Sequence, residues 1–287
     1  MINLAKITFR DEVLRSLANL HFSNSLSKFL LLVLATVVMC CKPNADHSQK
    51  SGIAISFDDH FIDEWYALRP LFKKYDAKVT FYVTCGDSLK PGEIAKLKEL
   101  EEDGHEIGFH GTIHGKSTEI IAAGGPQGYY TTEIEPGMRF MSAAGFRPTS
   151  YAHPGGNHNE TVDSVLYANG FKIIRDVAIA KRQLYGYQIY ALPPRLMPWI
   201  FYDFDKEKSV DALLIDTDAR LTEEEMRDAI QKAKETHTAL MLFGHEPLYK
   251  APENGEYGFS VAFLEVILKE AKAQKLHFYT MSELADQ

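Results

Sequence analysis

Short apolar segments that predict strands alternate with amphipathic segments that predict helices, and this alternation constrains the fold more than any other feature of the chain. A repeating strand and helix predicts a parallel sheet covered by helices. About seven such strands in 287 residues favour a closed or nearly closed (β/α) barrel in a single domain. A doubly wound open sheet is the alternative. The expected strands are Ile53–Phe57, Lys78–Thr84, His105–Phe109, Thr149–Ala152, Phe171–Arg175, Thr238–Phe243 and His277–Thr280.

The N-terminal segment predicts export to the cell envelope. The stretch Phe29–Cys41 is apolar throughout, follows Lys28 and gives way to polar residues, as the hydrophobic part of an export signal does. Cys40 and Cys41 stand where a bacterial lipoprotein is cleaved and acylated, which predicts membrane attachment through an N-terminal lipid. A retained anchor is one alternative, and two cysteines that are merely part of an apolar segment are another. We therefore divide the chain into a signal (1–41), a polar linker (42–51) and one domain (52–287).

The charge of the chain argues against nucleic acid as a partner. The formal net charge is -8, and residues 1–40 carry more basic than acidic side chains, so the rest of the chain is more acidic still. Binding to a phosphate backbone requires a basic surface. We expect no nucleic-acid partner.

Titratable residues follow several of the predicted strands directly. Asp58 and Asp59 follow the first strand, His110 follows the third, and His245 lies just beyond the sixth. The loop 153–156 after the fourth strand is a further candidate. Because functional groups gather at the carboxyl ends of parallel strands in both candidate folds, we expect these residues to lie together.

The spacing of His110 and His114 predicts a metal site. If the loop begins a helical turn, both imidazoles lie on one face, within reach of a single ion. Two histidines and a carboxylate form a recurrent catalytic set for zinc and for some other first-row metals. Asp58 and Asp59 cannot point the same way, so one can bind the metal while the other accepts a proton from the attacking water. The alternatives are two solvated histidines and an aspartate pair that caps a helix.

His245 is a candidate general acid, because a histidine at this position could protonate a leaving amine or alkoxide. A satisfied loop histidine is the competing interpretation. The remaining histidines are interpreted as ordinary residues. They are His21, His47, His60, His105, His158, His237 and His277.

Four motifs resemble those of the polysaccharide deacetylase family, which is also called the NodB-homology family or carbohydrate esterase family 4. Residues Ser56–Asp59 resemble its (T/S)FDD motif, and His110–His114 resemble its H-(S/T)-x-x-H motif, with Gly111 as a departure. Residues 152–156 resemble its R-x-P-x-G loop, and 242–245 resemble its late leucine and histidine motif. The likeness covers about residues 52–287, in the family's order.

The resemblance implies a deformed (β/α) barrel and a metal-dependent hydrolase that removes acetyl groups, most often N-acetyl, from a carbohydrate or a cell-envelope polysaccharide. Its implied partner is an acetylated glycan. Its implied cofactor is one divalent metal, with zinc expected and cobalt, nickel or manganese as alternatives. The roles carried over are the general base for Asp58, the metal ligands for Asp59, His110 and His114, the general acid for His245, and the oxyanion donor for the backbone N–H of Gly155.

The family arginine that holds the catalytic aspartate is replaced here by Ala152. We expect Arg175 to take over that task from the next strand, where a guanidinium can grip a carboxylate through two hydrogen bonds. The alternative is that Arg175 pairs with Asp176 or another acidic neighbour, and His153 is the next candidate for positioning Asp58.

Two other functions compete with deacetylation. A non-catalytic carbohydrate-binding protein on the same fold would have no need of the base Asp58 or the acid His245. A metal-dependent glycosidase would need two free carboxylates flanking the sugar, and the sequence shows no clear pair.

Overall fold

Seven parallel strands close into a barrel in the computed structural model, which describes residues 51–184, 187–253 and 256–287. The first strand pairs with the second on one edge and with the last on the other, so the ring of strands is complete. The predicted barrel is confirmed, and the open sheet is excluded. In barrel order the strands are β1 (Gly52–Asp59), β2 (Thr80–Val83), β3 (Glu106–Phe109), β4 (Ser150–Ala152), β5 (Ile173–Ala178), β9 (Ser209–Leu214) and β10 (Ala239–Gly244).

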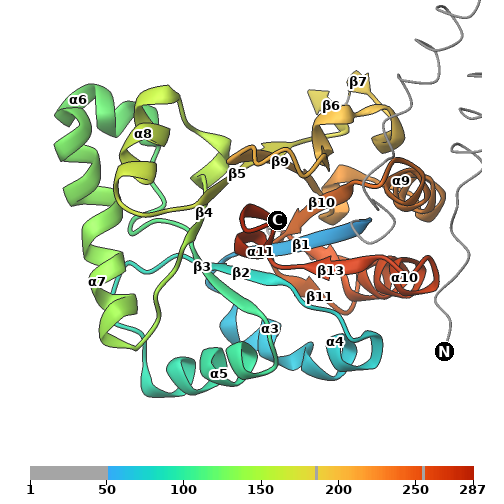
Figure 1. Cartoon of the computed structure of the whole chain (residues 1–287), viewed down its shortest axis with the longest axis horizontal. Coiled ribbons are helices and arrows are strands. Elements are labelled where there is room, and N and C mark those ends of the chain that lie inside the picture. Colours follow the sequence, from blue (N-terminus) through green and yellow to red (C-terminus); the bar gives the residue numbers. More distant parts are fainter. Residues whose placement is uncertain (1–50, 185–186, 254–255) are drawn as a thin grey trace, which may run out of the picture. The chain divides into compact units, whose positions relative to one another are not determined.

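Helices surround the barrel strands (Figure 1). The described residues from 51 to 287 belong to one compact unit. The predicted signal, 1–41, lies outside the described residues, as does the predicted linker apart from Ser51. Among the helices of the described ranges, none is both long enough and apolar enough to cross a membrane. The helices are α3 (Ile62–Ala67), α4 (Arg69–Tyr75), α5 (Pro91–Glu102), α6 (Ser117–Tyr129), α7 (Glu135–Ala143), α8 (Glu160–Ala168), α9 (Glu223–Thr236), α10 (Val261–Ala273) and α11 (Met281–Ala285), with a π-helical turn at Tyr130–Ile134.

Alternating side chains of the strands contribute to two hydrophobic cores, one between the barrel and its helices and one inside the barrel. In β1, Ile53, Ile55 and Phe57 belong to the cluster that packs against the helices, whereas Ala54 belongs to a second cluster with residues such as Met241. Successive side chains of a strand point to opposite faces. Asp58 shares the parity of Ala54 and therefore falls on the interior face of the barrel.

The strands of the barrel differ from the predicted set at two places. The barrel strand β9, between β5 and β10, was not predicted. The predicted strand at 277–280 exists as β13 (His277–Tyr279), but it pairs only with Gly52–Ala54 of β1. Because β10 occupies the opposite edge, β13 shares one edge of β1 with β2, and it separates these two strands near the start of β1.

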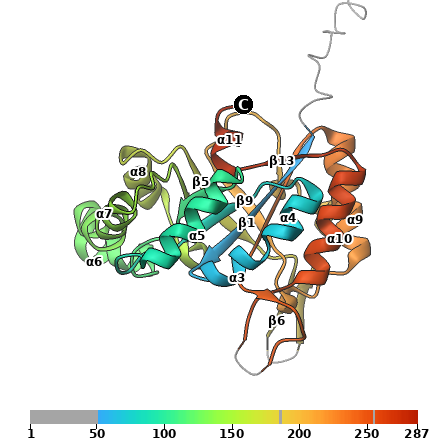
Figure 2. The ribbon, with the colours of Figure 1, turned by 90° about the horizontal axis from the view of Figure 1, so that it is seen from below.

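The last helix, α11, lies at the end of the barrel where β1 begins (Figure 2). Its Met281 and Leu284 are buried in the interior cluster. The loops that follow the strands therefore remain free to form a site at the other end. The short strands outside the barrel are β6 (Lys181–Leu184) and β7 (Tyr187–Ala191), which form an antiparallel hairpin, β8 (Phe201–Tyr202), which is antiparallel to β10, and β11 (Pro247–Leu248) and β12 (Phe259–Ser260), which pair with each other.

Candidate active site

Asp59, His110 and His114 converge on one point at the carboxyl end of the barrel. Oδ1 of Asp59 lies 3.6 Å from Nε2 of His110 and 3.4 Å from Nε2 of His114. Each residue offers one ligand atom to a common centre. Two imidazole nitrogens and one carboxylate oxygen fit zinc or another first-row metal and leave coordination positions for water and substrate.

His110 is prepared to act as a neutral ligand. It is buried, and its Nδ1–H donates to the carbonyl oxygen of Ala152 at 2.9 Å. Burial lowers the pKa of His110 to about 4. A backbone acceptor at Nδ1 fixes the tautomer and leaves the lone pair of Nε2 directed at the metal position.

The loop that carries His114 is not the helical turn that the i, i+4 spacing suggested. Residues 111–116 have no helical assignment, and His114 lies at φ 53°. The loop folds over the buried carboxylate of Glu133, to which the N–H of Gly115 donates at 3.4 Å. The N–H and the hydroxyl of Thr112 both donate to the Glu133 backbone carbonyl at 2.9 Å. Glu133 therefore shapes the loop that presents the second histidine.

Gly111, where the sequence departs from the H-(S/T)-x-x-H motif, is required for a steric reason. Gly111 lies at φ 84°, and a Cβ built there would be 2.0 Å from Oε1 of Glu133. Glu133 is fully buried and bound to the loop, so it cannot move aside without breaking those contacts. Glycine is thus the side chain that this combination of loop and glutamate accepts.

We predict that Gly111→Ala destabilises the fold by about 1–3 kcal/mol and weakens metal binding, because the left-handed backbone and the displaced glutamate both distort the His114 loop. Thermal unfolding and metal titration of the purified domain measure the two effects. Gly124→Ala is the matched control, since Gly124 lies in α6 with nothing within 4 Å of its Cβ position. Equal metal affinity in Gly111→Ala and the wild type would contradict this account of the loop.

Asp58 is held by Arg175 inside the barrel. A terminal guanidinium nitrogen of Arg175 donates to Oδ2 of Asp58, and both side chains are almost completely buried. Burial by itself raises the pKa of Asp58, but the positive charge of Arg175 and its hydrogen bond to the carboxylate contribute most to lowering the pKa below its usual value. Oδ1 of Asp58 has no hydrogen-bond partner among the described residues and remains available to accept a proton.

The neighbouring aspartates do not cap a helix. Helix α3 begins at Ile62, and its N-cap residue Phe61 makes no side-chain capping bond. Asp59 lies at φ 86°, and Oδ2 of Asp59 accepts a hydrogen bond from the Tyr257 hydroxyl at 2.7 Å. A positive φ at a residue other than glycine is costly and is often found at functional sites.

His245 is oriented by Asp216, a residue that sequence analysis did not single out. Nδ1–H of His245 donates to Oδ2 of Asp216 at 2.6 Å, and the His245 backbone N–H donates to Oδ1 at 3.1 Å. Burial lowers the pKa of His245, but the hydrogen bond to Asp216 and the nearby charge of Asp58 outweigh it and raise the pKa. Asp216 lies two residues beyond β9, the strand that was not predicted.

The loop after β4 adjoins the loop that carries His114. Gly155 is exposed, lies in the short turn Pro154–Gly156 at φ 58°, and has nothing within 4 Å of its Cβ position. Pro154 is 3.4 Å from the Cβ position of Gly111, so the turn adjoins the metal loop. His153 contacts Asp163 rather than Asp58. The role of Gly155 as an oxyanion donor stays a prediction.

Comparisons with known proteins bear on the family and on the fold. Residues 45–174 match the family model described as polysaccharide deacetylase. A solved structure of a Mycobacterium smegmatis protein assigned as a polysaccharide deacetylase aligns with a TM-score of 0.51 and 16% identity over 82% of this chain and 90% of its own. The catalytic domain of a peptidoglycan N-acetylglucosamine deacetylase from Eubacterium rectale aligns with a TM-score of 0.48 and 17% identity over 80% of this chain and 88% of its own. The peptidoglycan deacetylase PdaC from Bacillus subtilis aligns with a TM-score of 0.49 and 19% identity over 84% of this chain and 93% of its own. No curated protein sequence matches the chain.

The family model covers both aspartates of β1 and the two histidines of the metal cluster. The Mycobacterium smegmatis structure shares the fold along most of the chain. Residues 45–174 of the chain are therefore similar to the polysaccharide deacetylase family.

Proposed function

We propose that this protein is a metal-dependent hydrolase that removes acetyl groups, chiefly N-acetyl, from a cell-envelope polysaccharide. One observation carries the proposal. A cluster suited to one divalent metal lies beside a buried carboxylate held by Arg175, and a histidine held by Asp216 lies on the same end of the barrel. A base and an acid on either side of a metal are what amide hydrolysis requires.

Asp59, His110 and His114 would hold the metal, which supplies a Lewis acid that polarises the acetyl carbonyl and acidifies a water. Zinc is the expected ion, and cobalt, nickel or manganese would suit the same donors. Asp58 accepts a proton from the attacking water through its unpartnered Oδ1, while Arg175 fixes the other oxygen. The backbone N–H of Gly155 donates a hydrogen bond to the carbonyl oxygen as negative charge develops there.

The leaving amine needs a proton when the C–N bond breaks. His245 supplies it, because the hydrogen bond to Asp216 orients this imidazole and raises its pKa. Acetate and the free amino sugar are the products. An O-acetyl ester would be cleaved by the same groups, with an alkoxide leaving in place of the amine.

Acetate release from a panel of acetylated glycans tests the proposal. Zinc-loaded protein should release acetate, and chelated protein or the His110→Ala/His114→Ala double variant should not. Elemental analysis of the double variant should show the loss of about one metal per chain. Glycan binding without acetate release by metal-loaded protein would favour the non-catalytic carbohydrate-binding alternative, and an unchanged metal content would refute the ligand assignment.

We predict that Asp216→Asn moves the alkaline limb of the pH–rate profile to lower pH. Asp216 raises the pKa of His245, so its removal leaves burial to lower that pKa, and the imidazole loses its proton earlier as pH rises. The measurement is kcat across the pH range. The control is the exposed neighbour Asp218→Asn. An alkaline limb that stays in place would show that His245 is not the acid or that Asp216 does not set its pKa.

We further propose that the protein is exported and attached to the membrane of the cell envelope through its N-terminal segment. The support is Lys28, the apolar run Phe29–Cys41 and the polar residues that follow. Fractionation of cells that express the full chain should place it with the membranes. Unprocessed protein in the cytosol would refute export, and a soluble periplasmic form would refute attachment.

A further inference from the structure

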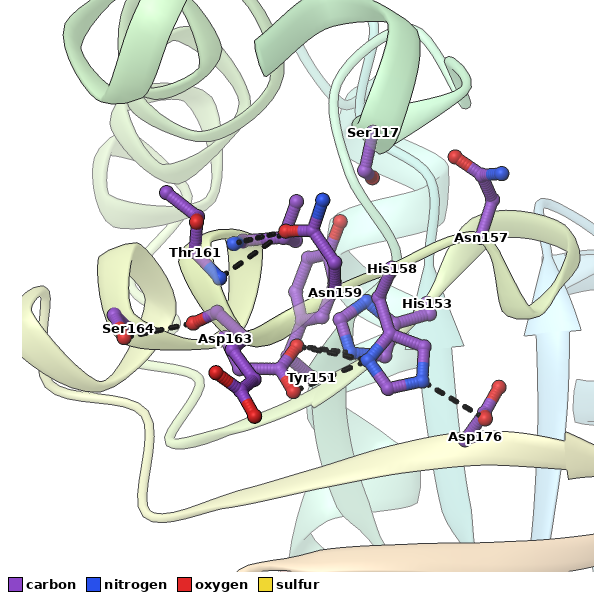
Figure 3. A network of polar contacts seen from close by, with 12 residues as sticks. Ser117, Tyr151, His153, Asn157, His158, Asn159, Thr161, Asp163, Ser164 and Asp176 are labelled. Atoms are coloured by element: carbon purple, nitrogen blue, oxygen red, sulfur yellow. Dashed lines mark hydrogen bonds and ion pairs between the residues drawn. The ribbon is translucent and has the colours of Figure 1, made fainter. Parts of the chain in front are cut away.

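His158 bridges two carboxylates that come from different elements of the fold (Figure 3). Its Nδ1 lies 3.0 Å from Oδ1 and 3.1 Å from Oδ2 of Asp163 in α8, and its Nε2 lies 2.9 Å from Oδ2 of Asp176 in β5. Ionised carboxylates only accept hydrogen bonds, so both ring nitrogens carry a proton and the ring is an imidazolium. The two hydrogen bonds raise the pKa of His158 to about 10, which keeps the bridge charged at neutral pH.

The bridge is partly shielded from water and packs against the ring of His153. The side chains of His158, Asp163 and Asp176 are 22%, 17% and 24% exposed, so their charges are screened less than those of an open surface pair. The rings of His153 and His158 stack with their centroids 4.2 Å apart and an interplanar angle of 16°. Burial lowers the pKa of His153, so a neutral ring lies against a charged one, an arrangement that cation–π attraction favours.

Gly155, the predicted oxyanion donor, lies in the loop 153–158 that this bridge closes. It is exposed at φ 58°, and no atom beyond its chain neighbours lies within 4 Å of its Cβ position, so nothing packs against that side of the backbone. Inside the turn, the N–H of Gly156 donates to the carbonyl oxygen of His153 at 3.1 Å. This bond shapes the turn but does not attach it to the rest of the barrel.

The loop is attached to its surroundings at both ends. At its start, the N–H of His153 donates to the carbonyl oxygen of Arg175 at 3.0 Å. At its end, the Asn157 side chain accepts hydrogen bonds from the N–H and the hydroxyl of Thr118 in α6, both at 2.9 Å. The attachment through His158 is charged and joins the loop to α8 and β5 together.

We propose that His158 is a positioning residue of the active site, whose bridge between Asp163 and Asp176 fixes the loop 153–158 and thereby the N–H of Gly155. The inference rests on the proposed function, because it takes Gly155 as the oxyanion donor. Without the bridge the loop keeps its two end attachments but is no longer held to α8 and β5. A donor to the developing oxyanion acts in the transition state, so its displacement lowers kcat and kcat/KM together.

Hydrogen exchange tests the bridge without reference to activity. In His158→Gln, whose side chain carries no charge and has a single donor group, the backbone amides of the loop 153–158 should exchange faster than in the wild type. The matched control is Thr222→Ala, which removes the capping hydrogen bond of α9, on the other side of the barrel from α8 (Figure 1). It should lower the melting temperature and leave the exchange of the loop unchanged.

Kinetics with the best glycan of the panel test whether the bridge serves the reaction. His158→Gln should lower kcat by roughly 10-fold to 100-fold and leave KM and metal content unchanged, because a misplacement of about 1 Å can cost about 100-fold. His158→Arg should restore most of the lost turnover, since a planar guanidinium can donate to both carboxylates and stack on His153. Thr222→Ala should keep the kcat of the wild type.

Two results would overturn the proposal. One is loop exchange in His158→Gln that is as slow as in the wild type, since the end attachments would then hold the loop by themselves. The other is faster exchange with unchanged kcat, which would mean that the bridge only joins α8 to β5. If His158→Gln does not fold, the same two measurements on Asp176→Asn decide, because that change removes the charge of one partner. Failure of the deacetylase proposal would appear separately, as a wild-type protein that releases no acetate.

Discussion

Asp58→Asn should lower deacetylase turnover by about 10²–10⁴-fold and leave the metal bound. An amide cannot accept the proton of the attacking water, and loss of general-base help typically has this effect. The interior position of Asp58 and its contact with Arg175 keep it apart from the ion that Asp59 would hold. The measurements are kcat with the best glycan of the panel and metal content by elemental analysis.

Two further variants make this result specific. Asp63→Asn removes an exposed carboxylate of α3 that pairs with Lys96, and it should leave both turnover and metal content unchanged. Asp59→Asn should lower metal affinity. If Asp58→Asn lost the metal while Asp59→Asn kept it, the roles of the neighbouring aspartates would be exchanged.

The barrel could be predicted because most of its strands are short apolar runs bounded by helical patterns. The strand β9 was the exception. Asp211 interrupts its apolar sequence, and this side chain lies beside Asp176 of β5, where burial raises the pKa of Asp211 to about 6. A carboxylate inside a strand weakens the apolar pattern on which the prediction depends. The strand β13 has the expected sequence pattern, but which edge it joins is a tertiary property.

Residues of the site could be predicted where chemistry and strand position coincide. Asp59 ends β1, and His110 and His245 directly follow β3 and β10, so their positions along the chain place them at the same end of the barrel. Glu133 binds the N–H of Gly115 and Asp216 binds the ring of His245, and in each case the two partners lie far apart in the sequence with no motif that relates them.

The replacement of the family arginine by Ala152 can be explained by the register of the barrel. Ala152 of β4 lies directly beside Arg175 of β5, so the two positions are at the same height on adjacent strands. Arg175 is fully buried and lies 4.3 Å from the ring centroid of Phe243, which holds the guanidinium against Asp58. A guanidinium from β5 can therefore reach the carboxylate for which the resemblance implies an arginine on β4. The predicted contact between Arg175 and Asp58 is present in the structure, but through one hydrogen bond rather than the two that were predicted.

Arg175→Met should sharply reduce turnover, leave the metal bound and move the acidic limb of the pH–rate profile to higher pH. Arg175 lowers the pKa of Asp58, so without it burial raises that pKa, and the base becomes protonated at a higher pH. Breaking a buried pair also destabilises the fold by about 3–5 kcal/mol, which thermal unfolding would detect.

A purely structural role for Arg175 would lower stability without moving the acidic limb, so the pH profile separates the two. Adding Ala152→Arg to Arg175→Met returns a guanidinium to the family's position on the neighbouring strand. Part of the turnover and the original acidic limb should then return, because β4 then presents a guanidinium to the carboxylate of Asp58. Rescue of stability without rescue of the acidic limb would show that Arg175 supports the barrel and that another group sets the pKa of Asp58.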